Sequence, residues 1–226
     1  MDNLEKYFEP FRNGTIGRNA TFQSPYGEKK VIYSDWTASG RLYDPIERNL
    51  LEKFGPFVAN THTETSVTGS TMTVAYHQAL KMIKDHVNAD SDDVIIATGS
   101  GMTGVVSKFQ RILGFKVHEN HRDQLLANGY DRPVVFITHM EHHSNHTTWL
   151  ESLVDVVIIR PSENDQCDLT HLEELLEEYK DRKVKIASVS ACSNVTGIVN
   201  PYHKVAKLMH QAGGLCFVDF ACSAPY

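Results

Sequence analysis

The residues best suited to chemistry lie in four short polar segments, each of which follows an apolar run. These are the glycine-rich turn TGSGMTG at 98–104, the histidine cluster 139–146, the segment around Asn194, and the segment from Asp219 to Cys222. Backbone amides of a glycine-rich turn before a helix bind phosphate. A carboxylate that ends an apolar strand needs a cationic or hydrogen-bonding partner, and an amide both donates and accepts. Together these groups favour a phosphate-bearing ligand with a protonated heterocycle.

The elements that must position these groups alternate between strand and helix. Apolar, β-branched runs predict buried parallel strands, and the segments between them predict helices. Such alternation indicates an α/β fold with three layers, in which a mostly parallel sheet carries helices on both faces. Ligands of these sheets bind beyond the carboxyl ends of the strands. The predicted strands are 94–97, 134–138, 154–159, 184–190 and 215–219, and the predicted helices are 101–113, 144–152, 170–179 and 201–211.

The N-terminal part is less regular. Residues 1–30 are polar and punctuated by Gly and Pro, which predicts an irregular arm ahead of one domain at 31–226, beginning with a short strand at 31–33. A helix is expected over 44–55, with Asp44 as N-cap, Pro45 in its first turn and Gly55 as its stop. Another begins at Thr71, after a polar loop. For the last helix of the chain the expected cap is Asn200, with Pro201 at the first position.

Composition sets the class of protein. The chain has 226 residues with 41% hydrophobic and 22% charged, as in soluble globular proteins, and its net charge of −6 argues against a general nucleic-acid binder. No apolar run approaches the roughly 18 residues that span a membrane, and the N-terminus lacks the features of a secretory signal. The four cysteines have no CxxC spacing. We therefore expect a cytoplasmic protein, with neither nucleic acid nor membrane as partner.

The glycine-rich turn has two further interpretations. Gly99, Gly101 and Gly104 match the GxGxxG pattern of a dinucleotide site, but an acidic residue should then close the next strand about 20 residues later. The next predicted strand ends well beyond that spacing, at Thr138, and Glu119 has the spacing but lies on no predicted strand. The phosphate of another cofactor is favoured over NAD, and a tight turn without a ligand remains an alternative.

The histidine cluster raises the question of a metal. His139, His143 and His146 would share a face if the segment were helical, which suits zinc. No carboxylate or thiolate has a recognised spacing to them, so no metal is predicted, and a solvated polar loop explains His143 and His146. Asp219 also has a plainer alternative, as a helix cap or a buried carboxylate with hydrogen-bond partners.

Read in order, these segments resemble a known family. YSDWTASGRLYDPIE, GSGMTG, MEHHSNHTTW, SACSNVTGIVNP and VDFACSA follow the segments of pyridoxal-phosphate enzymes of the class V aminotransferase and cysteine desulfurase family, across residues 31–226. The resemblance implies the large domain of the fold-type-I transferases, with the cofactor, pyridoxal 5'-phosphate, at a homodimer interface.

The resemblance also implies roles for individual residues. The turn, through Ser100, Gly101, Met102 and Thr103, would bind the cofactor's phosphate. His142 would stack on the pyridine ring, and Asn194 would hydrogen-bond its phenolic oxygen. Asp219 would pair with the ring nitrogen and keep it protonated, which lets the ring accept electrons. His142 and Asp219 are therefore the expected catalytic residues.

Three departures from the family pattern qualify this expectation. Met102 stands where relatives place a threonine, with Ser100 or Thr103 as substitutes for its hydroxyl, and Cys222 stands where many place a glutamine. The chain stops at Tyr226, ahead of the expected Schiff-base lysine and of the small C-terminal domain.

We therefore expect the N-terminal part of an enzyme, inactive alone. When complete it would act on an amino acid such as cysteine, as a desulfurase or C–S lyase more readily than as an aminotransferase. An NAD(P)-binding domain and a non-catalytic interaction module with this fold are the alternatives.

Overall fold

The computed structural model describes residues 2–36 and 38–224. The chain divides into two compact units, Met1–Ala97 and Thr98–Tyr226, which are described separately below. Among the described residues, no helix is both long and apolar enough to cross a membrane.

The first unit begins with regular structure where the sequence predicted an irregular arm. Helix α1 spans Asp2–Gly14, and strands β1 (Thr21–Ser24) and β2 (Gly27–Lys30) form an antiparallel hairpin. The tight connection depends on Gly27, whose φ of 88° lies in the left-handed region that glycine adopts without strain. The predicted strand at 31–33 does not form.

The remaining helices of this unit begin and end differently from the prediction. Helix α2 (Asp44–Asn49) has Tyr43 as its N-cap, so Asp44 is its first helical residue, and the chain continues through the π-helix η1 (Leu50–Phe54) and the 3-10 helix η2 (Gly55–Phe57). Gly55 therefore does not stop it. Helix α3 spans Val67–His86 and begins before Thr71, because the Ser66 side chain accepts a hydrogen bond from the Gly69 amide and caps it.

The predicted strand at 94–97 is wrong. These residues have no strand pairing, and Val94 and Ile96 are 82% and 54% exposed. An apolar run becomes a strand only where a neighbouring strand accepts its backbone hydrogen bonds. Among the described residues no strand does so for this segment.

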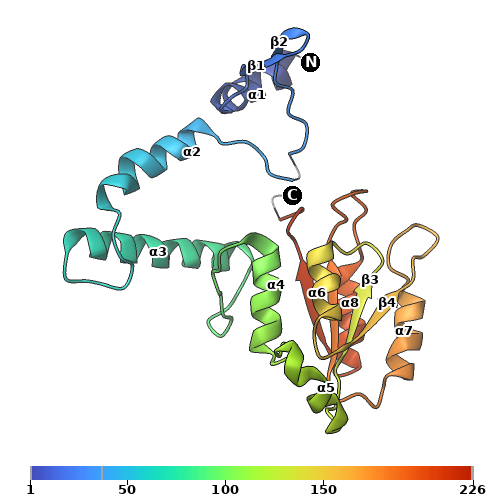
Figure 1. The fold of residues 1–226 in the computed structure, drawn as a ribbon. Helices are drawn as coiled ribbons and strands as arrows, with labels where there is room; N and C mark the ends of the chain where they lie inside the picture. Colours follow the sequence, from blue (N-terminus) through green and yellow to red (C-terminus); the bar gives the residue numbers. More distant parts are fainter. Residues whose placement is uncertain (1, 37, 225–226) are drawn as a thin grey trace. The chain divides into compact units, whose positions relative to one another are not determined.

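The second unit contains the predicted α/β fold (Figure 1). Its sheet has the order β4-β3-β5-β6, and all three pairings are parallel. Strands β3 and β6 have the predicted bounds, and the others differ by one residue. The strands are β3 (Val134–Thr138), β4 (Asp155–Ile159), β5 (Lys185–Ser190) and β6 (Leu215–Asp219). The helices are α4 (Gly101–Ile112), α5 (Glu119–Ala127), η3 (His143–Asn145), α6 (Thr147–Leu150), α7 (Leu169–Glu178) and α8 (Tyr202–Gln211).

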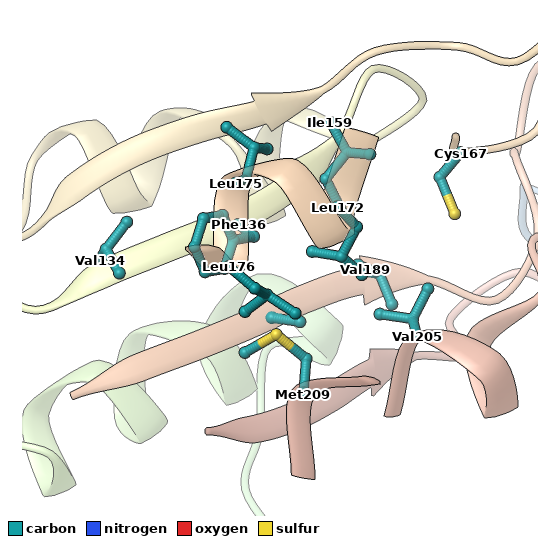
Figure 2. Close-up of a cluster of buried hydrophobic side chains, with 11 residues drawn as sticks. Val134, Phe136, Ile159, Cys167, Leu172, Leu175, Leu176, Val189, Val205 and Met209 are labelled. Atoms are coloured by element: carbon teal, nitrogen blue, oxygen red, sulfur yellow. The ribbon is translucent and has the colours of Figure 1, made fainter. Parts of the chain in front are cut away.

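The two faces of the sheet bury different side chains, as the two-residue period of a strand requires. On one face Val134 and Phe136 of β3 pack with side chains of α7 and α8, including Leu172 and Met209 (Figure 2). On the other face Val135 and Ile137 pack with Trp149 of α6 and Phe109 of α4. The helices on both faces confirm the three-layer architecture.

Two local predictions in this unit need correction. Helix α5 was not predicted, since its residues are polar and show little amphipathic pattern. Asn200 does not cap α8, whose N-cap is Pro201. Asn200 is instead 2% exposed, and its amide donates to the Ser190 carbonyl and accepts from the Cys167 amide. It therefore joins the end of β5 to the loop after β4.

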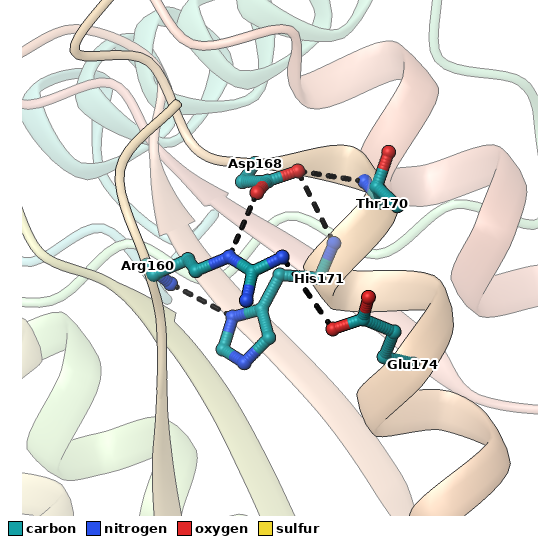
Figure 3. A network of polar contacts seen from close by, with 5 residues as sticks. All are labelled: Arg160, Asp168, Thr170, His171 and Glu174. Atoms are coloured by element: carbon teal, nitrogen blue, oxygen red, sulfur yellow. Dashed lines mark hydrogen bonds and ion pairs between the residues drawn. The ribbon is translucent and has the colours of Figure 1, made fainter. Parts of the chain in front are cut away.

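A polar network fixes α7 beside the end of β4 (Figure 3). Asp168 caps the helix by accepting from the Thr170 and His171 amides, and it pairs with Arg160 at 2.9 Å. His171 Nδ1 accepts from the Arg160 amide. The Arg160 guanidinium and these amides lower the pKa of the Asp168 carboxyl.

This lowered pKa leads to a prediction about acid stability. The network's contribution is fully present above the ordinary carboxyl pKa of about 4 and is lost as the pH falls through the lowered value. Asp168→Asn keeps the cap but carries no charge. We expect the difference in urea midpoint between the native chain and this variant to shrink between pH 6 and pH 3. An unchanged difference would mean that the ion pair does not stabilise the fold.

Candidate functional site

The carboxyl ends of three neighbouring strands bring most of the predicted site residues to one edge of the sheet. Strands β3, β5 and β6 end at Thr138, Ser190 and Asp219, and Ser190 pairs directly with Asp219 in the register. Because the strands are parallel, the loops that follow them begin at the same edge. Helix α4 also points its N-terminus toward this end of the sheet (Figure 1).

The glycine-rich turn has the backbone of an anion cradle. Ser100 and Gly101 both have positive φ, 69° and 60°. A β-carbon on Gly104 would lie 2.5 Å from the Gly99 carbonyl oxygen, so only glycine allows the turn to fold back on the helix. No side chain caps α4, and Gly101 and Thr103 are exposed. The helix therefore offers free amides and the positive end of its dipole to an anion.

The close approach at Gly104 leads to a prediction. In Gly104→Ala the new methyl group displaces the Gly99 carbonyl and with it the amides of the turn. We expect the affinity for inorganic phosphate to fall about tenfold, the loss of roughly one charge-assisted hydrogen bond. Isothermal titration measures it. Gly55→Ala, whose β-carbon makes only an ordinary contact at 3.7 Å, is the control. Equal phosphate affinities in the two variants would mean that the turn does not bind phosphate.

Asp219 is a buried carboxylate without a cation. The residue is 6% exposed, and its Oδ1 accepts a hydrogen bond from the Ala221 amide at 2.8 Å. Among the described residues it forms no ion pair. A buried carboxylate is costly unless a positive group completes its hydrogen bonding. The arrangement therefore suits a cationic ligand atom at the end of β6.

His142 is exposed, but its ring is held in place. Nδ1 accepts from the Ser144 amide at 3.2 Å and lies 2.8 Å from Ser144 Oγ. An acceptor Nδ1 puts the ring proton on Nε2. His142 caps the short helix η3, and this helix packs against α4. The ring is thus a fixed, exposed aromatic surface, as stacking on a ligand requires.

Asn194 lies in a pocket of about 390 Å³ beside the ends of β3 and β5. The pocket is also lined by His139, Met140 and Glu141 from the loop after β3. Asn194 is exposed, and no hydrogen bond to another described residue occupies its amide. Its donor and acceptor remain available to a ligand.

The Cys222 thiol makes a hydrogen bond within the chain. Its Sγ donates to the Cys192 carbonyl at 3.2 Å. Burial, the Cys192 thiol and the Asp219 carboxylate raise its pKa. Met102 is half-buried on α4, which leaves the exposed Ser100 and Thr103 as the hydroxyl groups nearest the free amides.

The structure adds Glu141, which the sequence presented only as part of a motif. Its carboxylate accepts five hydrogen bonds, from the amide and hydroxyl of Thr138, the amide and hydroxyl of Ser190, and the Asn145 side chain, at 2.6–3.2 Å. Glu141 therefore ties the end of β3 to the end of β5, where Ser190 pairs with Asp219 in the register. The signal in the sequence was an acidic residue three positions beyond a buried strand end.

Asn145 continues this network into the core. It donates to Glu141 and to the Ser188 carbonyl, and it accepts from Trp149 Nε1 and the Ser188 hydroxyl. Every hydrogen-bonding position of its amide is thus used. The buried network holds η3, and so the His142 ring, against the sheet.

The other histidines form no metal centre in the described part of the chain. Residues 2–36 and 38–224 contain no group of three or more His, Cys, Asp or Glu side chains that could hold an ion. The segment is a turn followed by η3 and α6, not the continuous helix that would align His139, His143 and His146.

Comparisons with known proteins identify a family for this chain. A model of the family described as aminotransferase class-V matches residues 32–226. A probable cysteine desulfurase of Halalkalibacterium halodurans is 27% identical over 196 residues, covering 87% of this chain and 45% of the relative. The aminotransferase-like protein FGM3 of Gibberella zeae is 24% identical over 218 residues, covering 92% and 49%. The chain thus spans about half the length of the curated relatives it matches.

Solved structures share the fold. The cysteine desulfurase CsdA of Escherichia coli superposes with a TM-score of 0.62 at 19% identity, covering 94% of this chain and 49% of that one. Mouse CSAD in its apo form gives a TM-score of 0.58 at 16% identity, covering 81% and 39%.

Proposed function

This chain belongs to the aminotransferase class-V family. We propose that it supplies the residues that bind pyridoxal 5'-phosphate non-covalently in an enzyme that acts on an amino acid. The observation that carries the proposal is the buried Asp219 carboxylate, which has no cation partner among the described residues and ends the strand paired with β5. The free amides of α4 supply the phosphate-binding feature that such a cofactor needs.

We propose a specific contact with the cofactor for each of these site residues. The α4 turn, through Ser100, Gly101, Met102 and Thr103, binds the phosphate. His142 presents its fixed ring to the pyridine, and Asn194 hydrogen-bonds the phenolic oxygen. Asp219 holds a proton on the ring nitrogen. The cofactor, when bound, supplies an electron-accepting ring.

The substrate and assembly are part of the same proposal. Relatives bear the name cysteine desulfurase, and we propose cysteine, or another amino acid with a breakable C–S bond, as the substrate class. We further propose a homodimer in the cytoplasm, where the four free cysteines are kept reduced.

The choice of cofactor has a direct test. Pyridoxal 5'-phosphate should raise the melting temperature of the 226-residue chain, and NAD at the same concentration should not, since ligand binding to the folded state stabilises it. Pyridoxal without phosphate is the matched control for the α4 turn. Stabilisation by NAD alone would replace the proposal by a dinucleotide site.

The lysines lead to a prediction about covalent chemistry. No lysine lies in the segments 98–104, 139–146, 191–199 or 220–224, and Lys108, Lys204 and Lys207 are exposed on helices. We expect borohydride reduction with pyridoxal 5'-phosphate to label the chain weakly and at scattered lysines, without amino-acid turnover. Peptide mass mapping checks this. One lysine labelled at a 1:1 ratio, with turnover, would contradict it.

A further inference from the structure

Two cysteines lie on neighbouring loops of the sheet edge. Cys192 follows β5 and Cys222 follows β6, two adjacent parallel strands. The Ala191 amide donates to the Asp219 carbonyl at 2.9 Å, so the strands are still paired where the two loops begin. The two cysteines therefore lie two and three residues beyond paired strand ends, on loops that start side by side.

The turn after β6 places the Cys222 thiol beside the loop that carries Cys192. The Ser223 and Ala224 amides donate to the Phe220 carbonyl, which forms one helical turn. The Cys222 Sγ consequently lies 3.2 Å from the Cys192 carbonyl oxygen. Cys192 is itself fixed by an antiparallel bridge to Val199. Both thiols are free and partly exposed.

From this juxtaposition we infer that Cys192 and Cys222 are a redox pair, which forms a reversible disulfide under oxidation. The pair ties the loop that carries Asn194 to the segment that follows Asp219. Formation of the disulfide does not depend on the proposed function. The effect of the disulfide on cofactor binding does rest on that proposed function.

The oxidant is a hydroperoxide, with hydrogen peroxide as the probe. One thiolate attacks the O–O bond, which gives a sulfenic acid and hydroxide. The second thiolate then attacks the sulfenic sulfur, the S–S bond forms and a second hydroxide leaves. Two thiols and one peroxide therefore yield one disulfide and two waters. Because the pKa of Cys222 is raised, thiolate is scarce near pH 7, and the reaction is run at pH 8.5.

The other two cysteines serve as internal controls. Cys167 is 3% exposed in the core cluster, and Cys216 packs against the same cluster from β6. Burial raises the pKa of each thiol to about 11. Neither has a thiol partner at the sheet edge, so neither is expected to form the bond.

The first experiment maps the bond in the 226-residue chain. The protein is treated with peroxide, alkylated, and digested without reduction. Cys216 and Cys222 share one tryptic peptide, so a chymotryptic cut at Phe217 and Phe220 separates them before mass spectrometry. We expect a linked Cys192–Cys222 peptide pair that disappears on treatment with dithiothreitol.

Variants decide whether the pair is specific. Cys192→Ser and Cys222→Ser should abolish the crosslink, while Cys167→Ser and Cys216→Ser should retain it. The proposal is overturned if Cys192 and Cys222 remain fully alkylated after peroxide, or if either one pairs with another cysteine.

A second measurement tests the consequence for the site and rests on the proposed function. A disulfide fixes the two sulfurs about 2.05 Å apart and so constrains the two loops relative to each other. We expect oxidation to weaken pyridoxal 5'-phosphate binding about tenfold, within the usual range of coupling between sites, and reductant to restore it. Unchanged affinity in the mapped disulfide form would overturn the coupling. Absence of binding in the reduced form would instead count against the cofactor assignment.

Discussion

Replacing Asp219 by Asn should weaken pyridoxal 5'-phosphate binding to this chain by about ten- to hundredfold. A hydrogen bond between a carboxylate and a protonated ring nitrogen contributes about 1.5–3 kcal/mol, which corresponds to that change in Kd. The amide of Asn keeps the acceptor for the Ala221 N–H but loses the negative charge. The free energy of unfolding should therefore change little.

The spectrum of the bound cofactor separates this effect from a general loss of binding. Without the carboxylate, the bound ring should lose its proton at a lower pH than it does in the native chain. Asp181→Asn, the same change at an exposed position, is the control. In a longer protein with turnover, we expect the rate to fall by about 10²–10³, as when a key electrostatic group is removed.

Two results would contradict the proposed role of Asp219. Equal Kd values for Asp219→Asn and the native chain would mean that the carboxylate does not face the ring nitrogen. A large loss of stability would mean that Asp219 serves the fold, as the buried carboxylate with satisfied partners that the sequence left open.

The sequence predicted the strands of the sheet well where burial alone defines them. Val134–Thr138 is apolar, mostly β-branched and buried at every position, and its bounds were correct. Leu215–Asp219 was also predicted with the correct bounds, although it ends the sheet and is only partly buried. The run 94–97 has the same composition, yet it forms no strand. Composition reports the tendency of a segment to be buried, whereas a strand also needs a partner, and a partner is a property of the tertiary structure.

Some residues of the candidate site could likewise be predicted from the sequence, and others could not. Groups at strand ends, such as Asp219 and Asn194, follow from the rule that ligands bind at the carboxyl edge of a parallel sheet. Glu141 and Asn145 depend on contacts with Ser188 and Ser190, more than forty positions later in the chain. No local pattern encodes such pairings, so the network that holds His142 emerged only from the structure.

That network gives the largest expected effect on stability. Glu141→Ala should lower the free energy of unfolding of the second unit by about 3–5 kcal/mol, because it leaves the Ser190 amide, the Thr138 amide and the Asn145 side chain without their acceptor. Glu141→Gln keeps one oxygen acceptor but presents a donor to the other groups, so an intermediate loss is expected. Urea unfolding followed by Trp149 fluorescence measures both, since that buried indole bonds to Asn145.

The matched control is Glu163→Ala, which makes the same change at an exposed position and should leave the urea midpoint unaltered. The order of stability should be native and Glu163→Ala, then Glu141→Gln, then Glu141→Ala. At temperatures where Glu141→Gln remains folded, it should also bind pyridoxal 5'-phosphate more weakly, since η3 and the His142 ring lose part of their anchor. Native stability in Glu141→Ala would show that water replaces the carboxylate at little cost, and the five hydrogen bonds would then not be what holds β3, β5 and η3 together.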